Sequence, residues 1–266
     1  MSLQHGLIKF LKTFVATASL FITFNFNLYS KSLLKKIFHG PVIDTSKVFE
    51  AFNDNFHKVS GLEIFRSEQL GYKKEKNYLQ SKNIQLTINL RGHHPESGWY
   101  RDQARAAKDS GATFICANTS ANSYPSMHAL LIMLAVIKNP RGVIENQKDA
   151  QKNPTKYIFA PNASTTDSWG NIIKIKANCM AGVDRTGMFC ALAVIERSPI
   201  ERMNDRQAKE ILKKAQAQLT LKYKHFKFMH YEMKDFIEDW WNLRKSKSLK
   251  HALEMYKPIN IKIGLN

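Results

Sequence analysis

The feature that most constrains the fold is a β-rich run that passes through a glycine-containing turn directly into an apolar helix. The run is Ile172–Ala177, the turn contains Gly182, and the apolar segment is Thr186–Glu196. A strand followed at once by a helix is the repeating unit of a parallel sheet, because the helix carries the chain back to the start of the next strand. This segment therefore predicts an α/β fold.

Other strands and helices alternate along the chain in the same way. Further β-rich runs cover 83–90 and 112–117, and helical patterns cover 99–108, 125–137, 205–223 and 229–244. Residues 143–171 are rich in polar side chains, so we expect a mostly irregular insertion with a short strand at Tyr157–Phe159. The tail after Lys245 is basic and lacks a clear pattern. The whole predicts a central, mostly parallel sheet flanked by helices.

The composition bounds the class of protein. The chain has 266 residues, of which 44% are hydrophobic, so it can bury a core of ordinary size and is not disordered as a whole. Three cysteines are too few for a disulfide framework. The 40 Lys and Arg against 22 Asp and Glu give a net charge of +18. This excess predicts an anionic partner, which is a membrane surface, a nucleic acid or a phosphorylated substrate.

The first 38 residues differ in character from the rest. Lys9 and Lys12 precede an uncharged stretch, Thr13–Ser30, which is typical of an export signal or an uncleaved membrane anchor. An N-terminal helix of the domain itself is the alternative. We therefore predict an N-terminal segment, 1–38, and one domain, 39–266. We expect an exported or membrane-associated protein, with a cytoplasmic one as the alternative. The basic residues that would then face anionic lipid are Lys31, Lys35 and Lys36.

The candidate chemistry lies in the turn between the run 172–177 and the helix. A turn at this place aims several backbone N–H groups into one concavity at the positive end of the helix, which suits a phosphate dianion. Arg185 can grip two phosphate oxygens in a bidentate fork, and Gly182 lets the backbone approach the ligand closely. The residues expected to line this cradle are Met180, Ala181, Gly182 and Val183.

Cys179 is the candidate nucleophile. The field that binds phosphate also favours a thiolate at this position, and a thiolate beneath a phosphate is placed for in-line attack on phosphorus. Thr186 can donate its hydroxyl to the sulfur. The alternative, a buried structural cysteine, does not explain why Gly182 and Arg185 follow at these offsets. Cys190, inside the apolar helix, is expected to be a core residue.

The segment Cys179–Gly187 resembles the Cys-x5-Arg-Thr/Ser signature of cysteine-dependent protein tyrosine and dual-specificity phosphatases. Phe65–Leu70 and Ile88–Arg91 resemble landmarks of the bacterial and atypical dual-specificity members, so the resemblance covers roughly residues 60–240. It implies their α/β fold and a two-step reaction through a phosphocysteine. It also implies that no metal or other cofactor takes part.

Two positions depart from the family pattern. The family usually has His before the nucleophile, whereas this chain has Asn178, and the family's acid loop corresponds to 117–124, which contains no carboxylate. Asp184 is the substitute general acid, as in phosphatases of this class that place an Asp before the Arg. An ion-pair or capping role is the alternative for Asp184. Asp167 is the rival acid if the insertion folds over the site.

Several other side chains are candidates for lesser roles. Arg91 ends a strand at the edge where such sheets bind ligands, so it is expected to contact phosphate, with a structural role as the alternative. Arg66 is expected to be structural. His93 and His94 are adjacent and are not expected to bind a metal. Cys116 is expected to be a buried thiol rather than a disulfide partner of Cys179.

The predicted function is hydrolysis of a phosphomonoester in phosphotyrosine, another phosphoprotein or a phosphoinositide. An inositol polyphosphate phosphatase is the alternative enzyme, and some RNA 5′-triphosphatases share the signature. A phosphate-binding pseudophosphatase is the alternative from a different class. The expected partners are a phosphorylated substrate and an anionic membrane surface rather than a nucleic acid.

Overall fold

Five strands form one sheet in the computed structural model, which describes residues 56–120, 123–220 and 231–263. The strands are β1 (His57–Lys58), β2 (Ile64–Ser67), β3 (Leu86–Asn89), β4 (Thr113–Cys116) and β5 (Ile175–Asn178), and their order across the sheet is β1-β2-β5-β3-β4. The pairs β2–β5, β5–β3 and β3–β4 are parallel, and only the edge pair β1–β2 is antiparallel among these strands. The predicted mostly parallel sheet is therefore confirmed.

The register brings the carboxyl ends of the four parallel strands to one edge of the sheet. Asn178 at the end of β5 is opposite Ser67 of β2 on one side and Asn89 of β3 on the other. Asn89 is in turn opposite Cys116 of β4. Parallel α/β sheets bind their ligands at this edge. The residues that follow β5 therefore continue from the end of the central strand and not from an edge strand.

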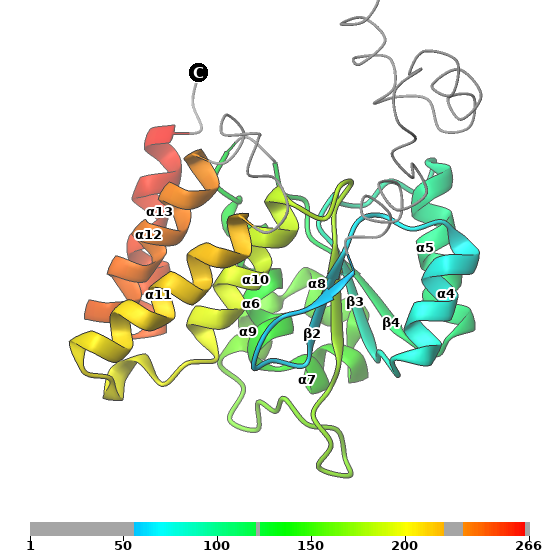
Figure 1. Cartoon of the computed structure of the whole chain (residues 1–266), viewed down its shortest axis with the longest axis horizontal. Helices are drawn as coiled ribbons and strands as arrows, with labels where there is room; N and C mark the ends of the chain where they lie inside the picture. Colours follow the sequence, from blue (N-terminus) through cyan, green and yellow to red (C-terminus); the bar gives the residue numbers. More distant parts are fainter. Residues whose placement is uncertain (1–55, 121–122, 221–230, 264–266) are drawn as a thin grey trace, which may run out of the picture. The chain divides into compact units, whose positions relative to one another are not determined.

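Helices cover both faces of the sheet (Figure 1). One face carries α4 (Tyr72–Ser81) and α5 (Gly98–Asp109), and the other carries α6 (Met127–Lys138), α10 (Asp184–Glu196) and α11 (Asp205–Thr220). Side chains of β2 alternate between these faces, because successive residues of a strand point to opposite sides. Phe65 packs with Leu79 of α4 and Ala107 of α5, whereas Ile64 belongs to the larger core on the side of α6 and α10.

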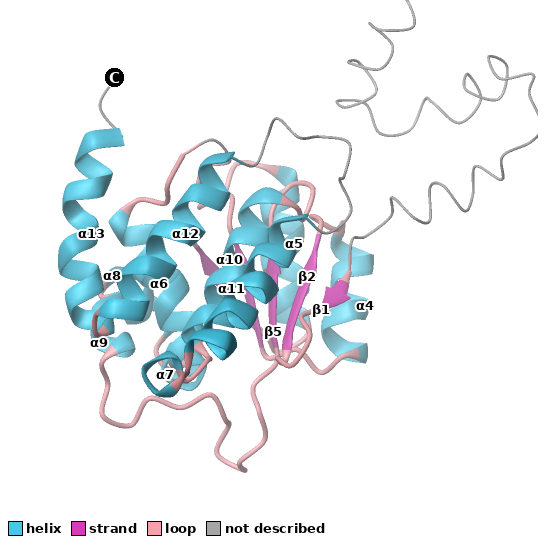
Figure 2. Ribbon diagram, turned by 60° about the vertical axis from the view of Figure 1, so that its left-hand side comes forward, coloured by secondary structure: helices cyan, strands magenta, loops and turns pink. Residues whose placement is uncertain are grey.

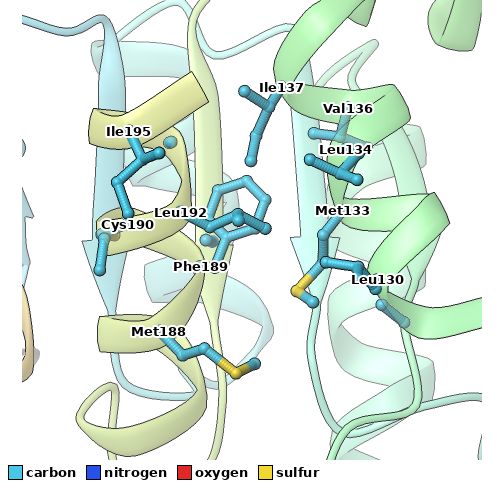
Figure 3. Close-up of a cluster of buried hydrophobic side chains, with 14 of the residues drawn as sticks. Leu130, Met133, Leu134, Val136, Ile137, Met188, Phe189, Cys190, Leu192 and Ile195 are labelled. Carbon is cyan, nitrogen blue, oxygen red and sulfur yellow. The ribbon is translucent and has the colours of Figure 1, made fainter. Parts of the chain in front are cut away.

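The larger core is centred on the contact between α6 and α10. Met188, Phe189 and Leu192 of α10 face the side chains of α6, among them Leu130 and Met133 (Figure 3). All five side chains are fully buried. Burial of one such side chain stabilises the fold by about 1.5–3 kcal/mol. This packing fixes the position of α10, and with it the turn that precedes the helix.

The prediction for residues 143–171 was wrong in part. The segment contains the second half of α7 (Pro140–Glu145), together with α8 (Gln147–Lys152) and α9 (Pro154–Ile158). Tyr157 and Ile158 therefore end a helix and do not form a strand. Each helix has five or six residues, which is too short for a helical pattern to show in the sequence. Two of them begin with proline, which is favoured at the first helical position. The connection from α9 to β5 is mainly a projecting loop (Figure 2).

The tail after Lys245, in which the sequence shows no clear pattern, is helical in the structure. Helix α12 (Tyr231–Ser246) is followed by a further helix, α13 (Leu249–Ile263). Tyr256 of α13 is buried, and its hydroxyl donates a hydrogen bond of 2.7 Å to the carbonyl oxygen of Pro125, just before α6. The tail is therefore part of the packed domain.

Residues 1–38 lie outside the described ranges, as does the predicted boundary after residue 38. Within the ranges that the structure describes, no helix is both long enough and apolar enough to cross a membrane. The export or membrane-anchor interpretation of this segment stays a prediction.

Candidate active site

The candidate nucleophile lies where β5 gives way to α10. Strand β5 ends at Asn178, Cys179 follows, and α10 begins at Asp184, so the four residues Met180–Val183 form the turn. Cys179 is 3% exposed, whereas Met180 is 57% exposed. The turn therefore lies at the ligand-binding edge of the sheet and at the N-terminus of α10, as the sequence predicts.

Gly182 is required by the space around the turn. Its φ is +69°, and a Cβ atom at this position would lie 2.4 Å from the carbonyl carbon and oxygen of Ser67. A contact of that length with backbone is not tolerated, because neither segment can move without displacing a strand. The residues that follow β2 thus pass directly against the turn.

Arg66 holds the turn from the side of α11. Its Nη2 donates a hydrogen bond of 2.7 Å to the carbonyl oxygen of Gly182, and its Nη1 donates one of 2.6 Å to that of Gln218. The side chain is fully buried. Each bond joins a charged donor to a buried carbonyl, which makes it stronger than a neutral hydrogen bond. The predicted structural role of Arg66 is confirmed by these contacts.

Arg185 in the first turn of α10 contacts the loop after β4. Its Nη1 donates a hydrogen bond of 3.4 Å to the carbonyl oxygen of Thr119. Thr119 is itself fixed, because its hydroxyl donates a bond of 2.7 Å to the carbonyl oxygen of Leu90. The Nε of Arg185 is buried and has no hydrogen-bond partner in the described ranges. The guanidinium is thus oriented by one backbone contact and retains donors for a ligand.

Arg91 lies close to Arg185 and Cys179. Burial lowers the pKa of Arg91, the charge of Arg185 lowers that pKa further, and Cys179 raises it. The guanidinium lies 3.9 Å above the ring of Trp99, and its Nη1 donates to Oε1 of Gln69. No ion pair with a carboxylate is found for Arg91 or Arg185 among the described residues. Two unneutralised guanidinium groups therefore lie beside the candidate nucleophile.

Asp184 and Thr186 lie in the first turn of α10. Asp184 is its first residue and is partly buried, so the structure places its carboxyl group at the turn. Thr186 is fully buried, and its hydroxyl has no hydrogen-bond partner in the described part of the chain. The hydrogen bond expected from Thr186 to the sulfur of Cys179 is thus not formed in this structure.

Asp167 does not belong to this site. Thr166 beside it pairs with Ile172, which precedes β5, so Asp167 lies near the amino ends of the parallel strands. Its carboxylate accepts hydrogen bonds of 2.9 Å from the backbone N–H groups of Trp169 and Asn171. These bonds stabilise a turn of the projecting loop and lower the pKa of the carboxyl group against the opposing effect of desolvation. The condition for Asp167 as rival acid, that the insertion folds over the site, is therefore not met.

The remaining candidates are explained by their contacts. The thiol of Cys116 is free and buried, and it donates to the Tyr100 hydroxyl at 3.8 Å. Nδ1 of His93 lies 2.7 Å from the Tyr100 hydroxyl, and Nε2 of His94 lies 3.0 Å from the carbonyl oxygen of Arg91. No cluster of three metal-ligating side chains occurs within residues 56–120, 123–220 and 231–263. The buried thiol expected at Cys116 is confirmed.

One feature beside the candidate nucleophile is not predicted from the sequence. Lys176 and Glu75 form a fully buried ion pair, and Lys176 also donates to Asn178, the residue that precedes Cys179. A lysine in a central strand indicates a buried partner, because lysine is almost never buried unless it is paired. The sequence around Lys176 does not identify that partner, since Glu75 lies 101 residues earlier in the chain.

Comparison with known proteins gives structural likeness only. No family model matches the chain, and no curated protein matches it in sequence. Solved structures similar to it include the core catalytic domain of the PP-IP phosphatase Siw14 from S. cerevisiae (16% identity, TM-score 0.39, 69% of this chain and 83% of that chain). A PTP-like phytase from Bdellovibrio bacteriovorus matches at 14% identity (TM-score 0.45, 72% and 83%).

A third similar structure is the Yvh1 phosphatase domain from Chaetomium thermophilum (11% identity, TM-score 0.44, 73% and 99%). The resemblance to cysteine-dependent phosphatases that the turn sequence predicts is thus accompanied by a resemblance to solved phosphatase structures.

Proposed function

We propose that the chain is a phosphatase that hydrolyses phosphomonoesters through a phosphocysteine at Cys179. The observation that carries this proposal is the convergence of Cys179, Arg185 and Arg91 at the carboxyl edge of the sheet, with both guanidinium groups lacking a carboxylate partner in the described ranges. Two such charges repel each other, and a dianion placed between them relieves that repulsion.

The first step forms the phosphocysteine. A phosphate group bound by Arg185 and the backbone of the turn presents its phosphorus to the sulfur of Cys179. The S–P bond forms as the P–O bond to the leaving group breaks, and the protonated carboxyl group of Asp184 gives its proton to the leaving oxygen. Positive groups at the site stabilise the charge that develops on the phosphoryl oxygens.

The second step restores the enzyme. A water molecule attacks phosphorus while the carboxylate of Asp184 takes its proton, the P–S bond breaks, and the Cys179 thiolate and inorganic phosphate are released. The chain's own residues therefore supply a nucleophile, an acid and base, and two cations.

The two guanidinium groups favour a substrate that carries strong negative charge beside the reacting phosphate. A phosphoinositide headgroup meets this condition, and so does phosphotyrosine in an acidic peptide; an inositol polyphosphate is the alternative small substrate. A pseudophosphatase is the second candidate function, because residues 117–124 contain no carboxylate and Asn178 replaces the usual His.

The experiment compares the full-length chain with its Cys179→Ser variant in the presence of a metal chelator. The test substrates are p-nitrophenyl phosphate, a phosphotyrosine peptide, phosphoinositide in vesicles and inositol hexakisphosphate. Release of phosphate that requires Cys179 supports the phosphatase. Tight binding of inorganic phosphate without turnover of any substrate would identify the pseudophosphatase instead.

The choice among substrates is tested with Arg91→Gln. We expect this change to lower kcat/KM by about tenfold for the substrate with additional negative charge and by less for p-nitrophenyl phosphate. Equal losses for both would show that Arg91 serves only the reacting phosphate.

A further inference from the structure

A chain of three fully buried polar residues ends directly beside the candidate nucleophile. Nζ of Lys176 lies 2.9 Å from Oε1 and 2.9 Å from Oε2 of Glu75 on α4. The same ammonium group donates to Oδ1 of Asn178 at 3.3 Å. All three side chains are 0% exposed, and Cys179 follows Asn178 in the sequence.

Such a chain is costly to bury. Removal of two ions from water costs several kcal/mol each, and a well-packed apolar pair of similar volume is often at least as stable. Packing does not require a lysine here, because Phe65, which is opposite Lys176 on β2 and faces the same helices, belongs to an apolar cluster. A contribution to stability therefore does not explain why this ion pair is present. Its location beside Cys179 suits a role in positioning that residue.

The hydrogen bond from Lys176 determines how the Asn178 amide is oriented. Since Oδ1 accepts from the ammonium group, the Nδ2 end must point away from it. Nδ2 is buried and has no hydrogen-bond partner within the ranges described. The backbone of Asn178 is fixed as well, because its carbonyl oxygen accepts a bond of 2.9 Å from the N–H of Leu90. Asn178 is thus held at both its backbone and its side chain.

We propose that Glu75, Lys176 and Asn178 form a positioning chain for Cys179, in the place where similar phosphatases carry a His. The inference rests on the proposed function. Lys176 and Asn178 point to the face covered by α4 and α5, while Arg66 holds the turn from the face covered by α11. The sulfur of Cys179 is therefore kept at its attacking position by contacts from both faces of the sheet. Glu75 neutralises and anchors Lys176.

The test uses the full chain and four variants. Glu75→Gln with Lys176→Met removes the ion pair without leaving a single buried charge, Asn178→Ala removes the last member, and a triple variant combines them. Lys138→Met is the matched control, because Lys138 also pairs with a fully buried glutamate, Glu196, at 3.4 Å, away from the turn. The measurements are kcat and KM for p-nitrophenyl phosphate, inhibition by inorganic phosphate, and the rate at which iodoacetamide modifies Cys179.

We expect the double variant and Asn178→Ala each to lower kcat by about ten- to a hundredfold, because a small displacement of the attacking atom is enough for such a loss. KM and the inhibition constant for phosphate should stay within about twofold. The triple variant should be no slower than the slower of the double variant and Asn178→Ala. The effects of substituting residues that act through one another do not add. Alkylation of Cys179 should slow in the same variants, and the control should match the wild type.

Three outcomes would overturn the positioning chain. A folded double variant with wild-type kcat and alkylation rate would do so, and so would additive losses in the triple variant. An equal loss in kcat and in phosphate affinity would mean that the ion pair only supports the cradle. If the double variant does not fold, Asn178→Ala decides, because it leaves the ion pair intact. If the wild type has no phosphatase activity, the proposed function fails, and the alkylation rates still test the positioning of Cys179.

Discussion

Arg66 donates a hydrogen bond of 2.7 Å to the carbonyl oxygen of Gly182, although 116 residues separate them in the sequence. The bond joins the end of β2 to the turn that follows β5, and a second bond from the same guanidinium reaches Gln218 of α11. One buried side chain thus fixes the turn against two other parts of the domain. The shape of the candidate phosphate cradle is therefore a property of the tertiary fold and not of the turn alone.

Replacement of Arg66 should accordingly affect both stability and phosphate binding. Arg66→Met leaves two buried carbonyl oxygens without their donors, which should lower the free energy of unfolding by about 2–4 kcal/mol. Urea unfolding measures this loss, and inhibition by inorganic phosphate measures the affinity of the site for phosphate, which should fall. Arg141→Met, which removes an exposed arginine paired with Glu145, is the control and should change neither. Wild-type stability in Arg66→Met would contradict the role given to these bonds.

Gly182→Ala tests the close approach at the turn. The added Cβ would lie 2.4 Å from the backbone of Ser67, so the turn must shift and kcat/KM should fall by about a hundredfold or more. Gly170→Ala is a matched control, because Gly170 also has a positive φ, +81°, but nothing lies within 4 Å of an added Cβ. Equal effects of the two changes would attribute the loss to backbone strain and not to the contact with Ser67.

The three cysteines should differ in their reactivity. Burial raises the pKa of Cys116 and of Cys190 to about 11, so both are protonated and unreactive at neutral pH. We expect iodoacetamide near neutral pH to modify Cys179 alone, and inorganic phosphate to protect it. Mass spectrometry of the digested protein locates the modification. Reaction of Cys116 should begin only as the pH approaches 11. Its reaction at neutral pH would contradict the raised pKa that burial gives this thiol.

The role of Asp184 is tested by the leaving group of the substrate. A general acid matters most when the leaving group is a poor one, so Asp184→Asn should lower kcat for phenyl phosphate about a hundredfold and kcat for p-nitrophenyl phosphate much less. Asp167→Asn is the control and should leave both rates unchanged, since Asp167 lies at the other end of the strands. If Asp184→Asn lowers both rates equally, Asp184 is not the acid.

The parts of the fold that could be predicted are those with a strong local pattern. The expected strand at 83–90 contains β3, and the expected apolar helix after the turn is α10. The turn between β5 and α10 could be predicted too, because its residues are contiguous. The short helices α7 to α9 were missed because five or six residues do not show a helical period.

The contacts that complete the site could not be predicted, because they join segments far apart in the chain. Arg66 was expected to be structural, but nothing local indicates that its partner is Gly182. Glu75 and Lys176 lie on a helix and a strand 101 residues apart, and only packing of α4 on the sheet brings them together. The position of Asp167 depends on how the polar loop before β5 folds, and the sequence of that loop does not determine this.

The most direct test of the central claim is to trap the covalent intermediate. The full-length chain is mixed with p-nitrophenyl phosphate in the presence of a chelator, the reaction is quenched with acid, and peptides are analysed by mass spectrometry. We predict a phosphoryl group on the sulfur of Cys179 in the wild type, none in Cys179→Ser, and more in Asp184→Asn, because loss of the base slows the second step. Metal-independent turnover in Cys179→Ser at the wild-type rate, with no phosphorylated cysteine, would contradict the account.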